Sequence, residues 1–375
     1  MSILKVDELQ SRTSGNRITL PEVNNYPPYR NLIINGDMSI AQRGTSATGL
    51  GNGDSGYHTV DRWSFIEAGA PTFEFTQTQD TDVPTGQGFA TSLKMDCTTA
   101  QGSLATSDAS YITQIIESQN LQYIKKGTSN AESLTCSFWV KSNKTGTYIV
   151  GLQEFQNTRY IANSYTINSA NTWEKKTITF AGDTTGTLTN DNSASLYLQF
   201  YLAVGTDYTS GTLATSWEST VNANRAVGQV NLADDTANEW YITGVQLEVG
   251  DSATPFEHLP YDVNLQRCQR YYEVIVSGTQ SSFGFGGSYA TNVVGFNLSY
   301  STKRAIPSLD ITTGTDYYNI YTGANNLMTS ISASNFTTIQ ATGYNNTEVT
   351  IADNTIGFFK THNDSNAYIA VDAEL

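Results

Sequence analysis

The chain has 375 residues, of which only 15% are charged, and 35 acidic against 20 basic residues give a formal net charge of −15. This excess of negative charge argues against nucleic acid or an anionic membrane as the main partner and favours a neutral glycan or another protein. The segment MSILKVDELQSR lacks the apolar stretch of a signal peptide, and no run of 18 apolar residues occurs, so neither Sec export nor membrane insertion is predicted.

Residues 1–30 are predicted to form an extended arm and linker. Pro27 and Pro28, in the segment NNYPPYR, favour extended backbone. A disordered terminus is the alternative, since composition does not separate the two. The apolar residues that would dock the arm onto a partner are Leu4, Val6, Leu9, Ile18 and Leu20.

Residues 31–260 are predicted to form an antiparallel β-sandwich. Short segments of alternating apolar and polar residues follow one another between turn-forming residues, without helical spacing. In LTCSFWV, for example, Leu134, Cys136, Phe138 and Val140 share one face. Strands are expected at 31–35, 63–66, 72–76, 92–97, 111–116, 133–141, 147–153, 160–167, 173–180, 195–204 and 240–248.

Residues 261–375 are predicted to form a short helix followed by a smaller β-domain. The helix is expected at Asp262–Tyr272, with Asp262 as the N-cap. Beyond it the chain returns to short strands with Gly-rich and Asn-rich turns.

Signatures of catalysis are not found in the sequence. The histidines His58, His258 and His362 do not lie in a metal-binding or nucleophile motif, and no phosphate-binding loop occurs. A carboxylate pair for glycoside cleavage stays open, because its spacing is a three-dimensional property. We therefore predict a protein that is not an enzyme and carries no cofactor. The chain has three cysteines, Cys97, Cys136 and Cys268, which lie far apart in the sequence. Their odd number and wide spacing favour buried free thiols in a reducing cytosol over a disulfide framework.

Aromatic residues supply the candidate binding residues. Trp217 lies in the polar segment TSWESTVNANRAVGQ, where an exposed indole could stack on a sugar ring or anchor a protein interface. The alternative is an indole folded back over a sheet edge. Tyr208 and Tyr321 are further candidates, since tyrosine suits adaptable surface recognition. The remaining tryptophans lie in predicted strands and are expected in the core: Trp63, Trp139, Trp173 and Trp240.

Several segments resemble, in content and order, a module of tail-fibre and appendage proteins of tailed bacteriophages, marine and cyanobacterial phages among them. The segments are NLIINGDMSIAQRG, YHTVDRW, SFWVKS, NTWEKKTITF and WYITGVQLEVGDSATPFEHLPYDVNLQRCQRYYE. The arm MSILKVDELQSRTSGNRITLPE and the segment FNLSYSTKRAIPSLDI are also similar to parts of such proteins.

The resemblance implies a jelly-roll sandwich, similar to galactose-binding and carbohydrate-binding modules. It further implies a virion structural protein, assembled in the host cytoplasm as a homotrimer with other virion proteins, that binds a host-surface glycan. The alternative is a purely architectural capsid fibre, decoration or adaptor protein.

Calcium is not predicted. Related modules often place a calcium-binding Asp in the last strand, where this chain has Gly244 and Val245. The carboxylates Asp37 and Glu248 could still coordinate an ion, although solvated or turn-capping roles are favoured.

Overall fold

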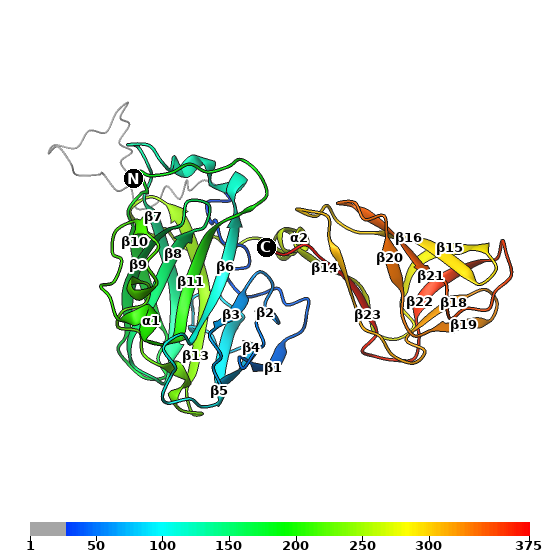
Figure 1. Ribbon diagram of the computed structural model, residues 1–375, viewed down its shortest axis with the longest axis horizontal. Coiled ribbons are helices and arrows are strands. Elements are labelled where there is room, and N and C mark those ends of the chain that lie inside the picture. Colours follow the sequence, from blue (N-terminus) through cyan, green and yellow to red (C-terminus); the bar gives the residue numbers. More distant parts are fainter. Residues whose placement is uncertain (1–27) are drawn as a thin grey trace, which may run out of the picture.

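A computed structural model describes residues 28–375, so the predicted docking residues Leu4, Val6, Leu9, Ile18 and Leu20 lie outside the described residues. The described chain consists mainly of antiparallel strands, arranged in two groups of sheets on either side of helix α2 (Tyr261–Gln269), as Figure 1 shows. The predicted all-β class is confirmed.

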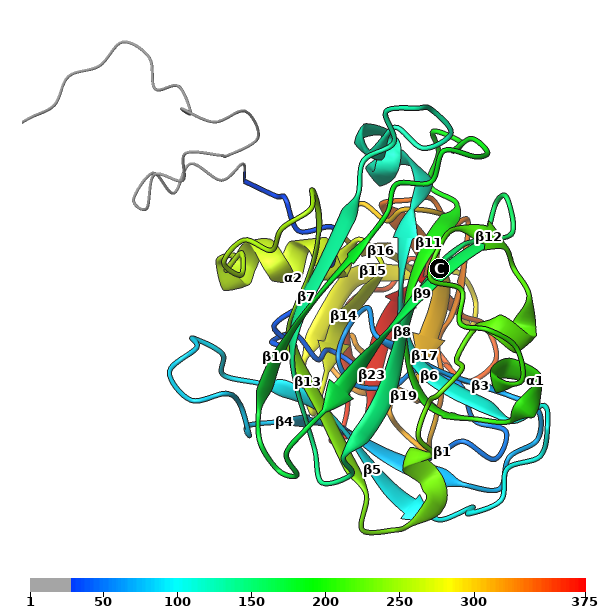
Figure 2. The ribbon, with the colours of Figure 1, turned by 90° about the vertical axis from the view of Figure 1, so that its left-hand side faces the viewer.

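Two sheets form the first group, here called the first sandwich, and face each other across its core (Figure 2). One sheet has six strands, in the order β1 (Ser46–Leu50), β4 (Glu74–Asp80), β5 (Ser92–Thr99), β13 (Glu239–Val249), β7 (Leu134–Ser142) and β10 (Glu174–Phe180). The other has seven, in the order β12 (Glu218–Ser219), β9 (Arg159–Ile167), β8 (Gly146–Glu154), β11 (Ala194–Val204), β6 (Ala109–Glu117), β3 (Ser64–Ala68) and β2 (Gly56–Tyr57).

Alternating apolar residues of the two sheets fill the core between them. The shared face predicted for LTCSFWV is confirmed, because its four inward residues are all buried in one cluster. Trp63 and Trp240 are fully buried, and each ring lies beside Phe200, with centroid distances of 6.3 and 6.2 Å. Burial of such large apolar surfaces is the main stabilising contribution to a sandwich.

Two core assignments are wrong. Trp139 and Trp173 lie on strands of the six-stranded sheet or at their edge, but both are only half-buried. Trp173 donates its indole N–H to Asp82 (2.9 Å), and the ammonium of Lys141 lies 5.6 Å from its ring centroid. Both side chains therefore lie outside the core that Trp63 and Trp240 share.

The apolar segment 31–35 is buried, yet it is not the strand that its sequence predicts. Side-chain amides accept its backbone N–H groups: Gln114 accepts from Ile34 (2.7 Å) and Asn264 from Asn35 (3.2 Å). The Leu247 carbonyl of β13 accepts a further backbone N–H of the segment (2.9 Å), so the buried backbone is satisfied without a regular strand ladder.

Short helical segments lie at the rims of the first sandwich and after it. They are η1 (Ser118–Ile124), α1 (Thr206–Thr209), η2 (Asn222–Asn224), η3 (Leu232–Asp234) and α2. The predicted helix is found, but Pro260 occupies the N-cap and Asp262 lies in the first turn, where its charge suits the helix dipole. Tyr272 already belongs to the next strand.

The second group of sheets, here called the C-terminal sandwich, has its own hydrophobic cluster. A three-stranded sheet contains β14 (Tyr272–Ser277), β23 (Tyr368–Asp372) and β17 (Ser308–Ile311). A seven-stranded sheet contains, in order, β19 (Asn325–Met328), β18 (Tyr318–Tyr321), β22 (Ile356–Thr361), β15 (Ser282–Ala290), β16 (Val293–Ser299), β21 (Gln340–Asn345) and β20 (Ser332–Ser334).

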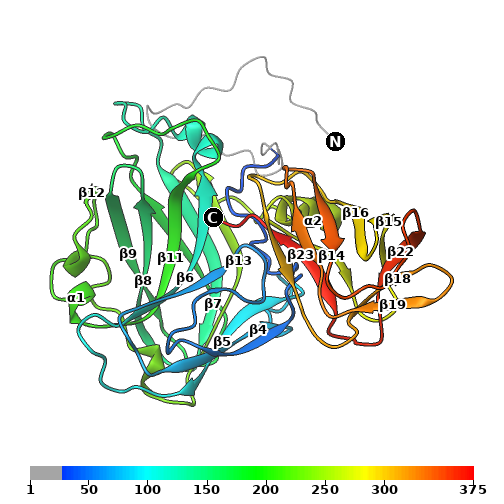
Figure 3. The same cartoon turned by 45° about the vertical axis from the view of Figure 1, so that its right-hand side comes forward.

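The end of the chain returns from β23 to the first sandwich, between the two groups of sheets (Figure 3). There the buried guanidinium of Arg62 pairs with the carboxylate of Glu374. Arg43 pairs with Asp372 (3.0 Å) and also with Glu374 (3.5 Å). These ion pairs attach the last residues to the segment that precedes β3.

A candidate ligand-binding pocket at the junction

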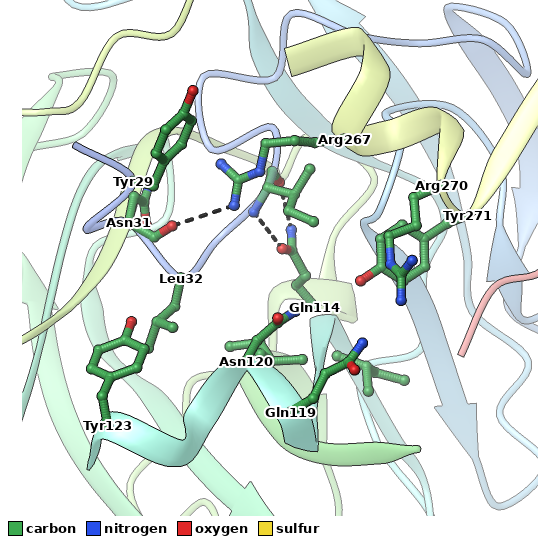
Figure 4. Close-up of a pocket in the computed structure, with 13 residues that line it drawn as sticks. Tyr29, Asn31, Leu32, Gln114, Gln119, Asn120, Tyr123, Arg267, Arg270 and Tyr271 are labelled. Carbon is green, nitrogen blue, oxygen red and sulfur yellow. Dashed lines mark hydrogen bonds between the residues drawn. The ribbon is translucent and has the colours of Figure 1, made fainter. Parts of the chain in front are cut away.

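A cavity of about 720 Å³ opens where the end of the arm, the first sandwich and helix α2 meet (Figure 4). We call it the junction pocket. In the view of Figure 4, Tyr29 and Tyr123 lie at one end and Arg270 and Tyr271 at the other. Its lining residues are Tyr29, Asn31, Leu32, Ile34, Gln114, Ile115, Ile116, Gln119, Asn120, Tyr123, Arg267, Arg270 and Tyr271.

The carboxylate of Glu257 holds the segment that carries Tyr29. Glu257 accepts the backbone N–H groups of Tyr29 and Asn31. The side chain of Asn31 bridges to β13, since its amide donates to the Val245 carbonyl (3.1 Å). The ring of Tyr29 is left exposed at the mouth of the pocket.

The 3₁₀ segment η1 forms another wall. Leu121 and Ile124 anchor it in the core, which leaves Gln119, Asn120 and Tyr123 directed toward the pocket and solvent (Figure 4). Tyr123 is the second exposed ring of the pocket.

Helix α2 and the residues after it contribute two arginines with different surroundings. Arg270 forms a bidentate pair with Glu117, with Nε and Nη2 at 2.9 and 2.8 Å from its oxygens. Arg267 makes one long hydrogen bond, to the Asn31 carbonyl (3.5 Å), and within residues 28–375 no carboxylate lies within ion-pair distance of it. Burial lowers the pKa of Arg267. Arg267 is thus a partly desolvated cation, and most of its N–H groups can still donate hydrogen bonds to a ligand.

This set of groups suits recognition of a sugar. Two exposed rings can stack on the apolar faces of sugar rings, while the amides of Gln119 and Asn120 and the guanidinium of Arg267 can hydrogen-bond hydroxyl or carboxylate oxygens. Among the described residues that line the pocket there is no Asp or Glu, and glycoside hydrolysis ordinarily needs a pair of them. The groups that line the pocket are thus those of a binding site.

The residues singled out from sequence lie elsewhere. Trp217 is half-buried, packs against the main core, and donates its indole N–H to the Ala181 carbonyl (2.6 Å). Tyr208 lies in α1 of the same sandwich, whereas Tyr321 lies exposed on β18 of the C-terminal sandwich. The three residues do not form one site, and a binding role for each stays a prediction.

Tyr208 belongs to a network on the outer face of the first sandwich. The guanidinium of Arg225 lies 5.6 Å from its ring centroid, donates to the hydroxyl of Tyr201 (3.1 Å), and contacts Gln153 and Gln199. Arg225 is buried, so the network holds the segment after β11 against the sheet.

The residues predicted as possible ion ligands are engaged in hydrogen bonds. Asp37 accepts from Ser39 and Asn264, and Glu248 from Gln246 and Thr254. Over residues 28–375 no cluster of three or more His, Cys, Asp or Glu side chains is placed to hold a metal. The three cysteines are buried and free, as predicted.

No helix within the described part of the chain has the length and apolar character needed to cross a bilayer.

Sequence reasoning missed the pocket because its walls come from three distant segments. The available signal was local: YPPYR, SQNLQY and QRCQRYY each place tyrosine beside amide or arginine residues. Nothing in the sequence indicated that these segments converge.

Comparisons with known proteins give distant structural likenesses. No protein-family model and no curated protein matches the chain. The enzymatically active domain of tailspike protein 4 from bacteriophage CBA120 is 17% identical over 60% of this chain, with a TM-score of 0.30, and the chain covers only 22% of that protein. A family 11 carbohydrate-binding module from Clostridium thermocellum is 11% identical, over 56% of this chain and 97% of the module, with a TM-score of 0.27.

One further likeness extends over both sandwiches. The tripod from the baseplate of bacteriophage Tuc2009 is 13% identical, over 93% of this chain and 91% of that chain, with a TM-score of 0.27. At these identities and TM-scores, none of the likenesses assigns a function to this chain.

Proposed function

We propose that the protein is a non-catalytic appendage of a tailed-phage virion that binds a host-surface glycan in the junction pocket. The observation that carries the glycan-binding role is the pocket itself, in which two exposed tyrosines, side-chain amides and Arg267 surround a cavity whose described lining residues include no carboxylate. The phage setting is supported by the ordered sequence segments, from NLIINGDMSIAQRG to the QRCQRYYE element.

Arg267 narrows the class of glycan. A guanidinium that is partly desolvated, and that has no carboxylate partner among residues 28–375, gains most from an anionic oxygen, because charge-assisted hydrogen bonds are about twice as strong as neutral ones. An acidic polysaccharide, bearing uronic or sialic acid, is therefore the preferred ligand class. The chain's net charge of −15 opposes it only at long range, where salt screens the repulsion.

Replacing Tyr123 by alanine, or Arg267 by methionine, should weaken glycan binding about tenfold or more, because each removes a central contact of the pocket. The measurement is a glycan array of acidic and neutral host-envelope polysaccharides, followed by titration calorimetry on the positive ligands. Arg267→Met should reduce the preference for acidic over neutral sugars, whereas Tyr123→Ala should weaken both.

The matched control is Tyr321→Ala, which removes an exposed tyrosine on the other sandwich. Retained binding in this control and loss in the pocket variants supports the proposal. Loss only in Tyr321→Ala, or in Trp217→Ala with an unchanged melting temperature, would move the binding site to the residues predicted from sequence. Absence of glycan binding by the wild-type chain would favour the architectural role.

A separate prediction concerns the arm. Deletion of residues 1–23 should prevent incorporation of the chain into phage particles, because the arm contains the apolar residues proposed to dock it, and should leave glycan binding unchanged. Immunoblots of purified particles made with the truncated chain test this. Normal incorporation would show that docking uses another surface. The homotrimer and the division at residues 30 and 260 also stay proposals.

A further inference from the structure

The seven-stranded sheet of the C-terminal sandwich lies at the end of the molecule remote from the first sandwich (Figure 1). One face of this sheet carries exposed apolar side chains. Five large side chains on β15, β18 and β22 form it, and each is between 43% and 72% exposed. We call this surface the outer aromatic face. Its residues are Phe285, Tyr289, Tyr321, Ile356 and Phe358.

Strand register brings these side chains into one patch. Tyr321 pairs with Phe358, and Phe358 pairs with Phe285, so three rings form a row across three adjacent strands. The rings of Phe285 and Phe358 meet edge to face, with centroids 5.4 Å apart. Ile356 pairs with Gly287, and the ring of Tyr289 covers Gly295, so glycines leave room for the large neighbours.

The sandwich's own core does not use these residues. On β22 the alternate residue Phe359 is buried in the core, which directs Ile356 and Phe358 to the opposite face. Positions on the solvent face of an antiparallel sheet are ordinarily polar. The exposed parts of the five side chains amount to roughly 600 Å², if each large residue carries about 150–250 Å². That equals or exceeds the largest apolar patch of an ordinary monomer, which reaches about 300–600 Å².

We propose that the outer aromatic face binds a second copy of this chain. Its area approaches the roughly 800 Å² per partner that a stable protein interface buries. The rings are tilted against each other and the row offers few hydrogen-bond donors or acceptors, which suits a dry protein contact better than the hydroxyls of a sugar. The interaction is independent of glycan binding at the junction pocket.

Charge also favours a copy of the same chain at this face. Two copies with a net charge of −15 repel each other wherever acidic surfaces meet. Among the outward residues of β15, β18 and β22 the charged one is Lys360, which lies over the ring of Tyr321 at 5.1 Å and donates to the side-chain oxygen of Gln280 (2.8 Å). The strands β15, β18 and β22 carry no Asp or Glu, so contact between these strands of two copies brings none of their carboxylates together.

The test is sedimentation velocity of the full chain over a range of concentrations, with the double variant F285S/F358S. We expect the wild-type chain to form a discrete oligomer, and the double variant to raise its dissociation constant at least tenfold. Both side chains are exposed, so the variant should keep the wild-type melting temperature. The matched control is F155S/I306S, which removes two equally exposed apolar residues elsewhere and should leave the oligomer intact.

Several outcomes would overturn the proposal: a wild-type chain that stays monomeric, a continuous size distribution without a discrete species, or an F285S/F358S variant with unchanged assembly. Loss of glycan binding in that variant, without a change in oligomeric state, would also overturn it and assign the face to a sugar. Tyr123→Ala should leave sedimentation unchanged, so the two proposals fail separately.

Discussion

Replacement of Arg62 by methionine is expected to lower the free energy of unfolding by about 3 kcal/mol, because it leaves the buried carboxylate of Glu374 with only the more distant Arg43 (3.5 Å) as an ion-pair partner. Glu374 is almost wholly buried and pairs with Arg62. Arg62 also donates to the Ile115 carbonyl (2.7 Å), and its guanidinium lies 3.5 Å from the ring centroid of Tyr271. Methionine replaces none of these charge-assisted contacts.

Because the Arg62–Glu374 pair connects the two sandwiches, the loss of stability should be measurable in both. All five tryptophans lie before residue 260, and their fluorescence during chemical denaturation therefore reports on the first sandwich alone. Hydrogen exchange of β23 reports on the C-terminal sandwich, which the chain end connects to Arg62. We expect faster exchange in β23 as well as a lower denaturation midpoint.

Lys125→Met is the matched control. It removes a cation whose pair with Glu132 is exposed, and exposed pairs contribute about 0–1 kcal/mol. If Arg62→Met changes stability no more than Lys125→Met, the buried ion pair does not hold the sandwiches together.

The strands of the first sandwich could be predicted because the alternation of apolar and polar residues that marks a strand lies within the strand's own sequence. Residues 134–140 alternate, and the structure buries the expected side of that strand. The segment 31–35 shows where this reasoning fails: its apolar residues are buried, but Gln114 and Asn264, which satisfy its backbone, are distant in sequence. Burial follows from composition, whereas hydrogen-bond partners follow from the fold.

The binding surfaces were harder to predict for the same reason. Trp217 stood out because its neighbours are polar, yet the fold supplies a carbonyl and an apolar rim that half-bury it. Tyr321 was singled out within the segment DYYNIY, but strand pairing places Phe358 and Phe285, from distant segments, beside it. A surface made from several strands becomes visible only when register is known.

Glu117 connects the junction pocket to the stability of the fold. Its carboxylate is fully buried at the end of β6 and accepts from Arg270, from the hydroxyl of Tyr271 (2.5 Å) and from Gln119 (2.5 Å). Burial by itself would raise the pKa of Glu117, but the hydrogen bonds from Arg270 and Tyr271 hold it below its ordinary value.

Because the pKa of Glu117 is lowered in the folded state, its contribution to stability changes with pH in a definite direction. The unfolded chain binds the proton more readily, so the stabilisation from Glu117 is complete above the ordinary value of 4.5 and is lost as the pH falls through the folded-state pKa. Glutamine at this position cannot take part in that equilibrium. Glu117→Gln should therefore destabilise the chain by about 2–3 kcal/mol at pH 7, since hydrogen bonds to a charged group are replaced by neutral ones.

At pH 3 the difference in stability between the wild-type and Glu117→Gln chains should be smaller than at pH 7, because below pH 4.5 the unfolded wild-type chain takes up the proton more readily than the folded one. Urea denaturation of both chains at pH 7 and pH 3 measures the two differences. Glu132→Gln, at an exposed carboxylate, should change stability by less than about 1 kcal/mol at either pH. A constant gap between wild type and Glu117→Gln at both pH values would mean that shape, and not the charge of Glu117, holds Arg270 and Tyr271 at the wall of the pocket.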